Sequence, residues 1–314
     1  SDRAVDVVDA MLCHLRDHEV EIRTNAAVSE LCIEDGHVCG VGLADGTHIE
    51  AASVILATGG ASYPATGSTG DGYALARAAG HTVTELFPAL VPLVTSEAWV
   101  KDVQGLSLRN VRASLYHAGK KEQDFFGEML FTHFGVTGPI ILQLSRRASE
   151  LLAAGTPDLE LRLNLKPALT HEKLRERVER DFATYERKQL RNAMIDLLPK
   201  RLIEPVLNAA GLSPERFAQQ ISSKERERLV QTLQALPLTV TGTRPIAEAI
   251  VTAGGVATRE IDPRTMESKI VKHLYFVGEL VDVDAYTGGY NLQAAFSMGH
   301  AAGSYSVWNL EGDK

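Results

Sequence analysis

Apolar and polar residues alternate in several short stretches of the chain, and a period of two predicts β-strands. Val28–Ile33 and Val38–Leu43 lie on either side of Asp35-Gly36, a dipeptide typical of a two-residue hairpin turn. LELRLNL at Leu159–Leu165 alternates in the same way, as a half-buried strand does. Between residues 90 and 134, the segments LVPLV, LRNVRASLYHAG and EMLFTHF predict further short strands. Much of the first half of the chain is therefore expected to be β-structure.

Other segments have the apolar spacing of helices. This spacing predicts helices over Ala4–His18 and Tyr73–Ala79 and another that starts near Asn291. Thr170–Ala235 is helical in pattern and highly charged, with acids and bases mixed as on a solvated helix face. Within that stretch, helices are expected to start at Thr170 and Ser222 and to be interrupted at Pro199, Pro205 and Pro214.

The first sixty residues predict the remaining elements of a sheet. Ser1 and Asp2 look like an N-cap before the first helix. A short strand is predicted at Glu21–Arg23, and Val54–Ala57 has the apolar run of a buried strand. Asp45-Gly46 predicts a second tight turn.

Charge and hydropathy exclude several classes of partner. The formal net charge is −8, and no long basic run or aromatic–basic interleaving occurs, so we expect no nucleic-acid partner. No apolar run reaches membrane-spanning length, and the first residues do not resemble a signal peptide, so we expect a cytoplasmic protein without a membrane partner. His171, His273 and His300 lack ligand spacing with acids or cysteines, so no metal site is expected.

Three cysteines occur, at Cys13, Cys32 and Cys39, without a CxxC motif. The predicted hairpin places Cys32 opposite Cys39 on neighbouring strands, which makes a redox pair conceivable. Two reduced, apolar residues in a cytosolic hairpin are the favoured interpretation.

The most informative stretch lies near the C-terminal end. A short apolar strand, Leu274–Val277, leads into Gly278-Glu279 and an acidic loop that contains Asp282. Gly288-Gly289 then opens an apolar helix. A carboxylate accepts ribose or ribityl hydroxyls, glycines let the backbone approach a ligand, and the free N–H groups of a helix start attract negative charge. This order suits the ribityl and pyrophosphate end of a flavin dinucleotide.

A second half-site lies upstream. SVILATGG at Ser53–Gly60 reads as a buried strand that ends in glycines, and YPATGSTGDG at Tyr63–Gly72 leads into a helix. Glycine-rich turns between a strand and a helix are where α/β folds bind nucleotides. Each segment alone is equally consistent with plain turn chemistry.

Taken together, these motifs resemble a known family. The segments ATGG, TGSTGDGY, FTHFGVTGP at Phe131–Pro139, VTAGGV at Val251–Val256 and LYFVGELVDVDAYTGGYNLQAAF look like the bacterial YhiN/BaiN-type flavoproteins, which are NAD(P)/FAD-dependent oxidoreductases. The resemblance covers nearly the whole chain. FTHxGxTGP and TGGYNLQ are specific to this family, whereas ATGG and TGDG are shared with fumarate-reductase-like flavoproteins.

The resemblance implies the fold class α/β, with a discontinuous Rossmann-like FAD-binding domain and an inserted β-barrel-plus-helices cap domain. We expect residues 1–81 and 257–314 to form the FAD-binding domain and 82–256 to form the insert, which is mainly β over 82–168 and mainly helical over 169–256. The family normally opens with a strand, a GxGxxG turn and a helix that cradle the FAD pyrophosphate. GxGxxG does not occur in these residues, so we expect the N-terminal βαβ unit to be missing.

The resemblance and the loop chemistry together nominate a set of FAD contacts. Glu279 is expected to accept ribityl or ribose hydroxyls, with a cap on backbone amides as the alternative. For Asp71 the helix-cap role is favoured over a ligand contact, and for Val28 the alternatives are an adenine contact or a core position. The nominated cofactor-binding residues are Val28, Ala57, Thr58, Gly59, Gly60, Thr66, Gly67, Gly70, Asp71, Gly278, Glu279, Asp282, Gly288, Gly289, Tyr290, Asn291 and Leu292.

A flavin reductase also needs a proton donor and a substrate anchor beside the ring. His133 in FTHFG is the leading catalytic candidate because histidine exchanges a proton near neutral pH. Thr132 and Arg244 come next. A packed core role for His133 stays open, and the hydroxyls of Tyr63, Tyr286 and Tyr290 are alternative donors.

Two functions from different classes follow. The first is an FAD-dependent oxidoreductase that moves hydride from NAD(P)H or another donor to an organic acceptor, a small molecule with an activated C=C bond. NAD(P)H would then bind transiently at the cleft between cap and flavin. The second is a redox sensor or interaction protein in which FAD is structural or regulatory. The oligomeric state cannot be read from the sequence.

Overall fold

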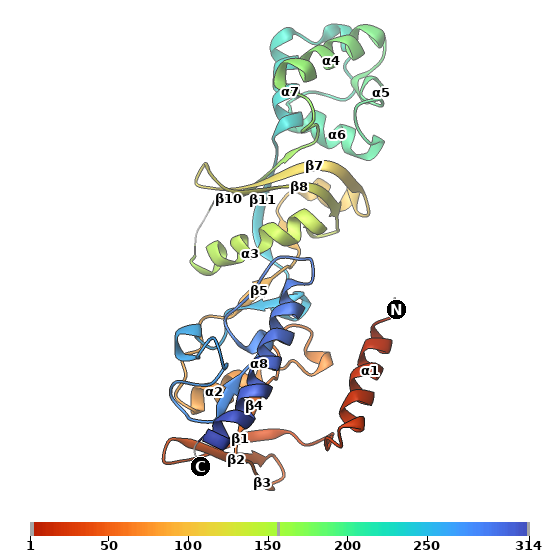
Figure 1. Ribbon diagram of the computed structural model, residues 1–314. Helices are drawn as coiled ribbons and strands as arrows, with labels where there is room; N and C mark the ends of the chain where they lie inside the picture. The colour runs from red at the N-terminus through yellow and green to blue at the C-terminus, as the bar shows by residue number, and fades with distance from the viewer. Residues whose placement is uncertain (1–2, 156–157, 313–314) are drawn as a thin grey trace.

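The computed structural model describes residues 3–155 and 158–312. Figure 1 shows a group of helices at one end, a barrel in the middle, and a second group of strands and helices that carries both chain termini. The helices and the barrel share one hydrophobic core, built from residues between Leu93 and Val240. A second core takes residues from both ends of the chain, among them Val38 and Ala302. The chain therefore leaves the second core, builds the first, and returns.

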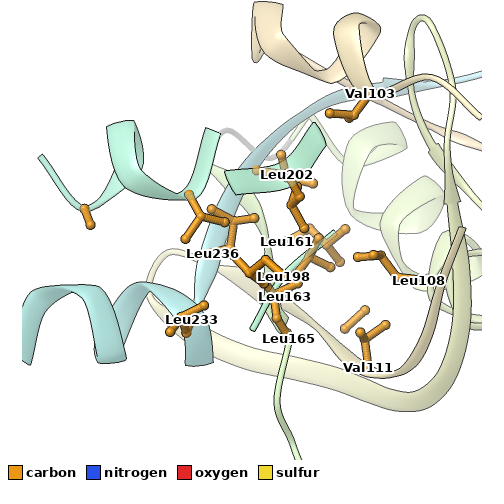
Figure 2. Packing of buried hydrophobic residues seen from close by; sticks show 14 of the residues in the cluster. Val103, Leu108, Val111, Leu161, Leu163, Leu165, Leu198, Leu202, Leu233 and Leu236 are labelled. Atoms are coloured by element: carbon orange, nitrogen blue, oxygen red, sulfur yellow. The ribbon is translucent and has the colours of Figure 1, made fainter. Parts of the chain in front are cut away.

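A closed six-stranded barrel forms the middle part. All its strand pairs are antiparallel, and Leu161 lies opposite Leu115 on one neighbour and Leu238 on the other. Figure 2 shows Leu161 and Leu163 packed inside this region, where the alternation of the sequence buries them completely. In barrel order the strands are β10 (Leu159–Asn164), β11 (Leu236–Thr243), β6 (Leu93–Thr95), β9 (Gly135–Thr137), β8 (Lys120–Phe131) and β7 (Ser107–His117).

Five helices accompany the barrel. They are α3 (Pro139–Ala153), which packs on β8, and α4 (His171–Thr184), α5 (Leu190–Ala193), α6 (Lys200–Ala209) and α7 (Ser223–Gln234), which form the end group. Both predicted helix starts are confirmed. Thr170 accepts a hydrogen bond from the Lys173 amide, and Ser222 forms a capping box with Glu225. The predicted break at Pro205 is wrong, because Pro205 lies inside α6, where burial of the apolar face outweighs one lost backbone hydrogen bond.

The second part combines a parallel strand pair with an antiparallel sheet. β4 (Val54–Leu56) pairs in parallel with β13 (Leu274–Phe276), and the long helix α8 (Tyr290–Gly312) packs against both. The other elements here are α1 (Ala4–Asp17), the sheet strands β1 (Val28–Glu34), β2 (His37–Leu43) and β3 (His48–Glu50), and α2 (Asp71–Ala78).

A two-stranded antiparallel ribbon connects the two parts. Its strands are β5 (Phe87–Ala89) and β12 (Val251–Ala253), so the outgoing and returning chain segments lie side by side. Six short 3₁₀ helices complete the described elements: η1 (Pro64–Thr66), η2 (Ala98–Val103), η3 (Ala218–Gln220), η4 (Ile246–Glu248), η5 (Thr258–Glu260) and η6 (Gly278–Leu280).

Several local predictions need correction. The strand predicted at Glu21–Arg23 is irregular, because no strand in the described part of the chain pairs with it. Cys32 lies opposite Gly40 rather than Cys39, since the register shifts at a bulge, and the Cys39 thiol donates to the Cys32 carbonyl oxygen. The proposed cap at Ser1 and Asp2 falls outside the described residues. Across 3–155 and 158–312, no helix is both long and apolar enough to cross a membrane.

Candidate functional site

The two glycine loops predicted from the sequence meet at one edge of the parallel strand pair. Leu56 at the end of β4 lies beside Phe276 at the end of β13. The Val277 amide donates to the Leu56 carbonyl oxygen at 3.1 Å, so the two strands stay paired up to their ends. The loops that follow, Ala57–Gly60 and Gly278-Glu279, therefore leave the sheet side by side, at the edge where α/β proteins bind ligands.

Glycine is required here by close contacts between loops. A Cβ atom at Gly60 would collide with the Glu279 carboxylate and the Thr252 hydroxyl, and one at Gly72 would collide with the Thr58 hydroxyl. The backbone of the upstream half-site at Gly60 therefore packs directly against the Glu279 side chain of the other half-site. Gly289 differs, because a side chain there would meet no described atom within 4 Å, although its φ of +85° still favours glycine.

Glu279 joins three segments of the site. Its Oε1 accepts a hydrogen bond from the Thr252 amide at 2.7 Å. The Thr252 hydroxyl accepts from the Ala61 amide at 2.8 Å, and the Tyr73 hydroxyl donates to the Glu279 carbonyl oxygen at 3.3 Å. Burial, and then the negative charge of Glu279, raise the pKa of Tyr73 well above its usual range, so Tyr73 remains a neutral donor. Glu279 thus caps a backbone amide, and its contact with a ligand hydroxyl stays a prediction.

A cavity of about 400 Å³ lies at the N-terminus of α8. Its wall is mostly apolar, with Glu279, Thr287 and Asn291 among its polar members, which is the usual character of a small-molecule site. Of the nominated residues, those that line it are Gly278, Glu279, Gly288, Gly289, Asn291 and Leu292.

The described residues fit a flavin dinucleotide at this edge. The cavity is of ligand size, and Gly288, Gly289 and Asn291 at the N-terminal end of α8 line it. In the neighbouring loop, the buried hydroxyl oxygen of Thr58 has no hydrogen-bond partner among the described residues. A buried hydroxyl without a partner is costly, so a ligand oxygen would satisfy it.

Asn291 acts on the loop that precedes it. Its side chain accepts from the Ala285 amide and donates to the Ala285 carbonyl oxygen, both at 2.8 Å. Asp282 accepts from the Thr84 hydroxyl at 3.1 Å. Both side chains are therefore engaged in holding residues 281–289, whereas Tyr290 is exposed.

The expected cap role of Asp71 is corrected. Gly70, with a φ of +83°, is the N-cap of α2, and Asp71 is the first helical residue, whose Oδ1 accepts from the Gly72 amide. The left-handed turn at Gly70 starts the helix at Asp71, one residue earlier than an Asp71 cap would. Thr66 and Gly67 lie in the turn before it, where the Thr66 hydroxyl donates to the Tyr63 carbonyl oxygen.

Several nominated residues lie away from this cavity wall. Val28 starts β1 opposite Leu43 and packs against the second core, so its adenine contact stays a prediction. Thr66, Gly67, Gly70 and Asp71 belong to the loop before α2 and do not line the cavity.

Thr132, His133 and Arg244 gather at the β8–β9 turn. The His133 ring is exposed and meets the Phe134 ring edge-on, with centroids 4.9 Å apart. Arg244 lies over the same Phe134 ring at 4.8 Å, and its guanidinium donates to both carboxylate oxygens of Glu248 at 2.9 and 2.6 Å. Thr132 Oγ1 accepts from the Gly135 amide at 3.1 Å. These three residues are mutual neighbours that do not line the cavity, so their catalytic roles stay predictions.

Sequence reasoning missed three residues that organise the site. Thr252 links both glycine loops, Tyr73 supports Glu279, and Arg146 binds Asp284 from the barrel side. Thr252 lies in the VTAGGV motif, which was a usable signal. No sequence signal marked Arg146, because it is an ordinary charged residue on an amphipathic helix.

Comparisons with known proteins agree with these motifs. Residues 1–305 match the family model described as HI0933-like protein Rossmann domain. A 3-dehydro-bile acid delta(4,6)-reductase from Clostridium scindens is 32% identical over 96% of this chain and 73% of the relative. A ribosomal RNA dihydrouridine synthase from Haemophilus influenzae is 31% identical over 90% of this chain and 67% of the relative. A ribosomal RNA dihydrouridine synthase from Escherichia coli is 30% identical over 96% of this chain and 71% of the relative.

Proposed function

Because the chain belongs to the HI0933-like Rossmann-domain family, we propose that it is an FAD-dependent oxidoreductase that reduces an activated C=C bond in a small organic molecule. Membership of this flavoprotein family and a reductase relative support an oxidoreductase enzyme. The observation that carries the proposal is the cavity at the glycine start of α8, beside the closely packed strand-end loops.

The residues that would hold FAD belong to both half-sites. Gly278, Glu279 and the amides from Gly288 onward would bind the ribityl and ring end, and Thr58 offers its unsatisfied hydroxyl from the other loop. When bound, FAD supplies hydride chemistry, with NAD(P)H as the proposed donor. The positive end of the α8 dipole would favour negative charge near its first turn.

We propose that residues at the β8–β9 turn supply the proton and anchor the acceptor. Saturating a C=C bond adds a hydride to one carbon and a proton to its neighbour. His133, which is exposed, would give the proton, and the Arg244 guanidinium would orient the acceptor's carbonyl group.

The names of the relatives point to one shared chemistry. A bile acid delta(4,6)-reductase and a dihydrouridine synthase both saturate C=C bonds conjugated to a carbonyl group. We propose that the acceptor here is a small enone, because the net charge of −8 disfavours a polyanionic RNA. Uridine in RNA is the competing acceptor in the test below.

We propose further that the FAD-binding domain is discontinuous, formed by residues 1–81 and 257–314, with 82–256 as an inserted cap. The two separate hydrophobic cores and the β5–β12 ribbon between them support this division.

Stopped-flow reduction tests the function. We expect the FAD-loaded protein to be bleached by NADH or NADPH and reoxidised faster by a conjugated steroid enone than by buffer alone. A ribosomal RNA fragment that contains uridine is tested in parallel. Faster reoxidation by this RNA would identify uridine in RNA, and not a small enone, as the acceptor. FAD that binds but stays inert with both nicotinamides and all acceptors would instead identify a binding or sensor protein.

A further inference from the structure

The cavity wall includes a loop that is also held by the barrel. We call residues 281–289 the acidic loop. Arg146 on α3 forms a two-pronged ion pair with Asp284 of this loop, with Nε–Oδ2 at 3.1 Å and Nη2–Oδ1 at 3.3 Å. The Asp284 side chain is only 9% exposed, and Arg146 also lies over the Phe87 ring at 5.3 Å. The carboxylate is therefore largely removed from water, whereas the Arg146 side chain keeps 35% of its surface exposed.

Two neighbouring positions of the acidic loop also contact the barrel part. The Gln143 side chain on α3 donates to the Thr287 hydroxyl at 3.5 Å. Tyr286 accepts from the Gln123 side chain at 3.3 Å, and its ring meets Phe125 at 5.6 Å between centroids. Tyr286 and Thr287 themselves line the cavity. Barrel contacts thus act directly on the cavity wall.

The acidic loop is also held by Asn291 of α8, through two hydrogen bonds with the Ala285 backbone. Of these contacts, the Arg146 pair carries the greatest consequence. Removing the guanidinium would leave the Asp284 carboxylate buried without its partner, in a loop that also carries Asp282. The loop would then have to move outward to hydrate Asp284.

We propose that Arg146 is a positioning residue that fixes the acidic loop, so that the barrel part determines the shape of the cofactor cavity. This inference rests on the proposed function only in naming FAD as the cavity's ligand. The coupling itself, from α3 through Asp284 to the cavity wall, is a property of the chain. Arg146 does not itself line the cavity, so its effect passes through the loop.

The neighbouring arginine supplies a matched control. Arg147 lies on the same helix, pairs with Glu122 at 2.8 Å, and shares Glu150 with Arg146. Its partner lies on β8 and not in the acidic loop. Arg146→Ala and Arg147→Ala therefore each remove one arginine and two ion pairs, one of them with Glu150, but only the first removes a partner of the acidic loop.

Hydrogen exchange of the acidic loop and FAD binding, measured by fluorescence quenching, test the inference in the full chain. We expect Arg146→Ala to speed exchange over residues 283–289 and to weaken FAD binding by about ten- to hundredfold, because only the fraction of molecules with the loop in place would bind FAD. Arg147→Ala should leave both near the wild-type values. Equal exchange and equal affinity in the two variants would overturn the inference.

Two further measurements keep the outcomes distinct. If Arg146→Ala does not fold, Arg146→Lys, which retains the charge but loses the two-pronged geometry, should give the same pattern more weakly. Wild-type behaviour of Arg146→Lys together with Gln143→Ala would then refute the coupling. If wild-type protein fails to bind FAD, the proposed function fails, whereas the exchange comparison still decides the role of Arg146.

Discussion

At the scale of single residues, two substitutions of Glu279 distinguish its structural role from a role in ligand binding. Its carboxylate accepts from the buried Thr252 amide, so Glu279→Ala should lower the free energy of unfolding by about 1–3 kcal/mol even without FAD. Glu279→Gln keeps an acceptor for that amide but removes the charge. If the carboxylate also binds ribityl hydroxyls, the Gln variant should keep apo stability and lose about tenfold in FAD affinity. Thermal melts with and without FAD measure both effects, and wild-type FAD affinity in Glu279→Gln would reduce Glu279 to a cap.

The buried ring of His81 predicts that the stability of the fold decreases at acid pH. Its ring is buried, with Nε2 hydrogen-bonded to Ser268 at 2.8 Å, and burial lowers its pKa below 6.5 despite the Glu260 carboxylate nearby. A histidine with a depressed folded pKa binds fewer protons when folded than when unfolded. Its contribution to stability is therefore intact above about pH 6.5 and is lost as the pH falls below that value.

His81→Gln should consequently flatten the fall in stability between about pH 6.5 and 5. Urea unfolding at a series of pH values measures this slope. His133→Gln is the control, because the His133 ring is exposed. Identical slopes in wild type and His81→Gln would show that other groups cause the acid sensitivity.

At the scale of elements, Gly138 of FTHFGVTGP lets α3 begin close to β8. Gly138 has a φ of +98° and starts α3, and a Cβ there would lie 2.9 Å from the Cα of Met129 on β8. Gly119, in the turn between β7 and β8, has a φ of +78° but open space around it. Alanine at Gly119 should cost about 1–2 kcal/mol for the left-handed backbone.

Gly138→Ala should lower the free energy of unfolding by the same backbone cost of about 1–2 kcal/mol and by a further 1–3 kcal/mol, roughly, from overpacking against β8. Chemical denaturation of the two variants, compared with wild type, gives the difference. Equal losses would mean that α3 moves freely away from β8. The expected result would make this motif partly a packing signature, independent of any ligand.

Most elements could be predicted because their causes are local. Alternation placed β1, β2 and β10 (Leu159–Asn164), and caps placed α4 and α7. The proximity of the loops Ala57–Gly60 and Gly278-Glu279 was also predictable, since parallel strands bring their carboxyl ends to one edge of the sheet. Arg146 and Asp284 could not be paired in advance, because 138 residues separate them and no periodicity links their positions. The cap role of Glu279 toward Thr252 was likewise only one of two alternatives until the fold joined them.

At the scale of the whole molecule, the two hydrophobic cores predict two units that fold separately. Every buried residue of the first core lies between Leu93 and Val240, and the β5–β12 ribbon brings the ends of residues 82–256 together. Expressed alone, residues 82–256 should give a folded module with strand and helix signals in circular dichroism and one cooperative unfolding transition. Leu161→Ala, which empties a completely buried barrel position, should destabilise the isolated module and the full chain alike, by about 2–5 kcal/mol. A random-coil spectrum for the module, or a Leu161→Ala loss seen only in the full chain, would show that the barrel depends on the second core for its stability.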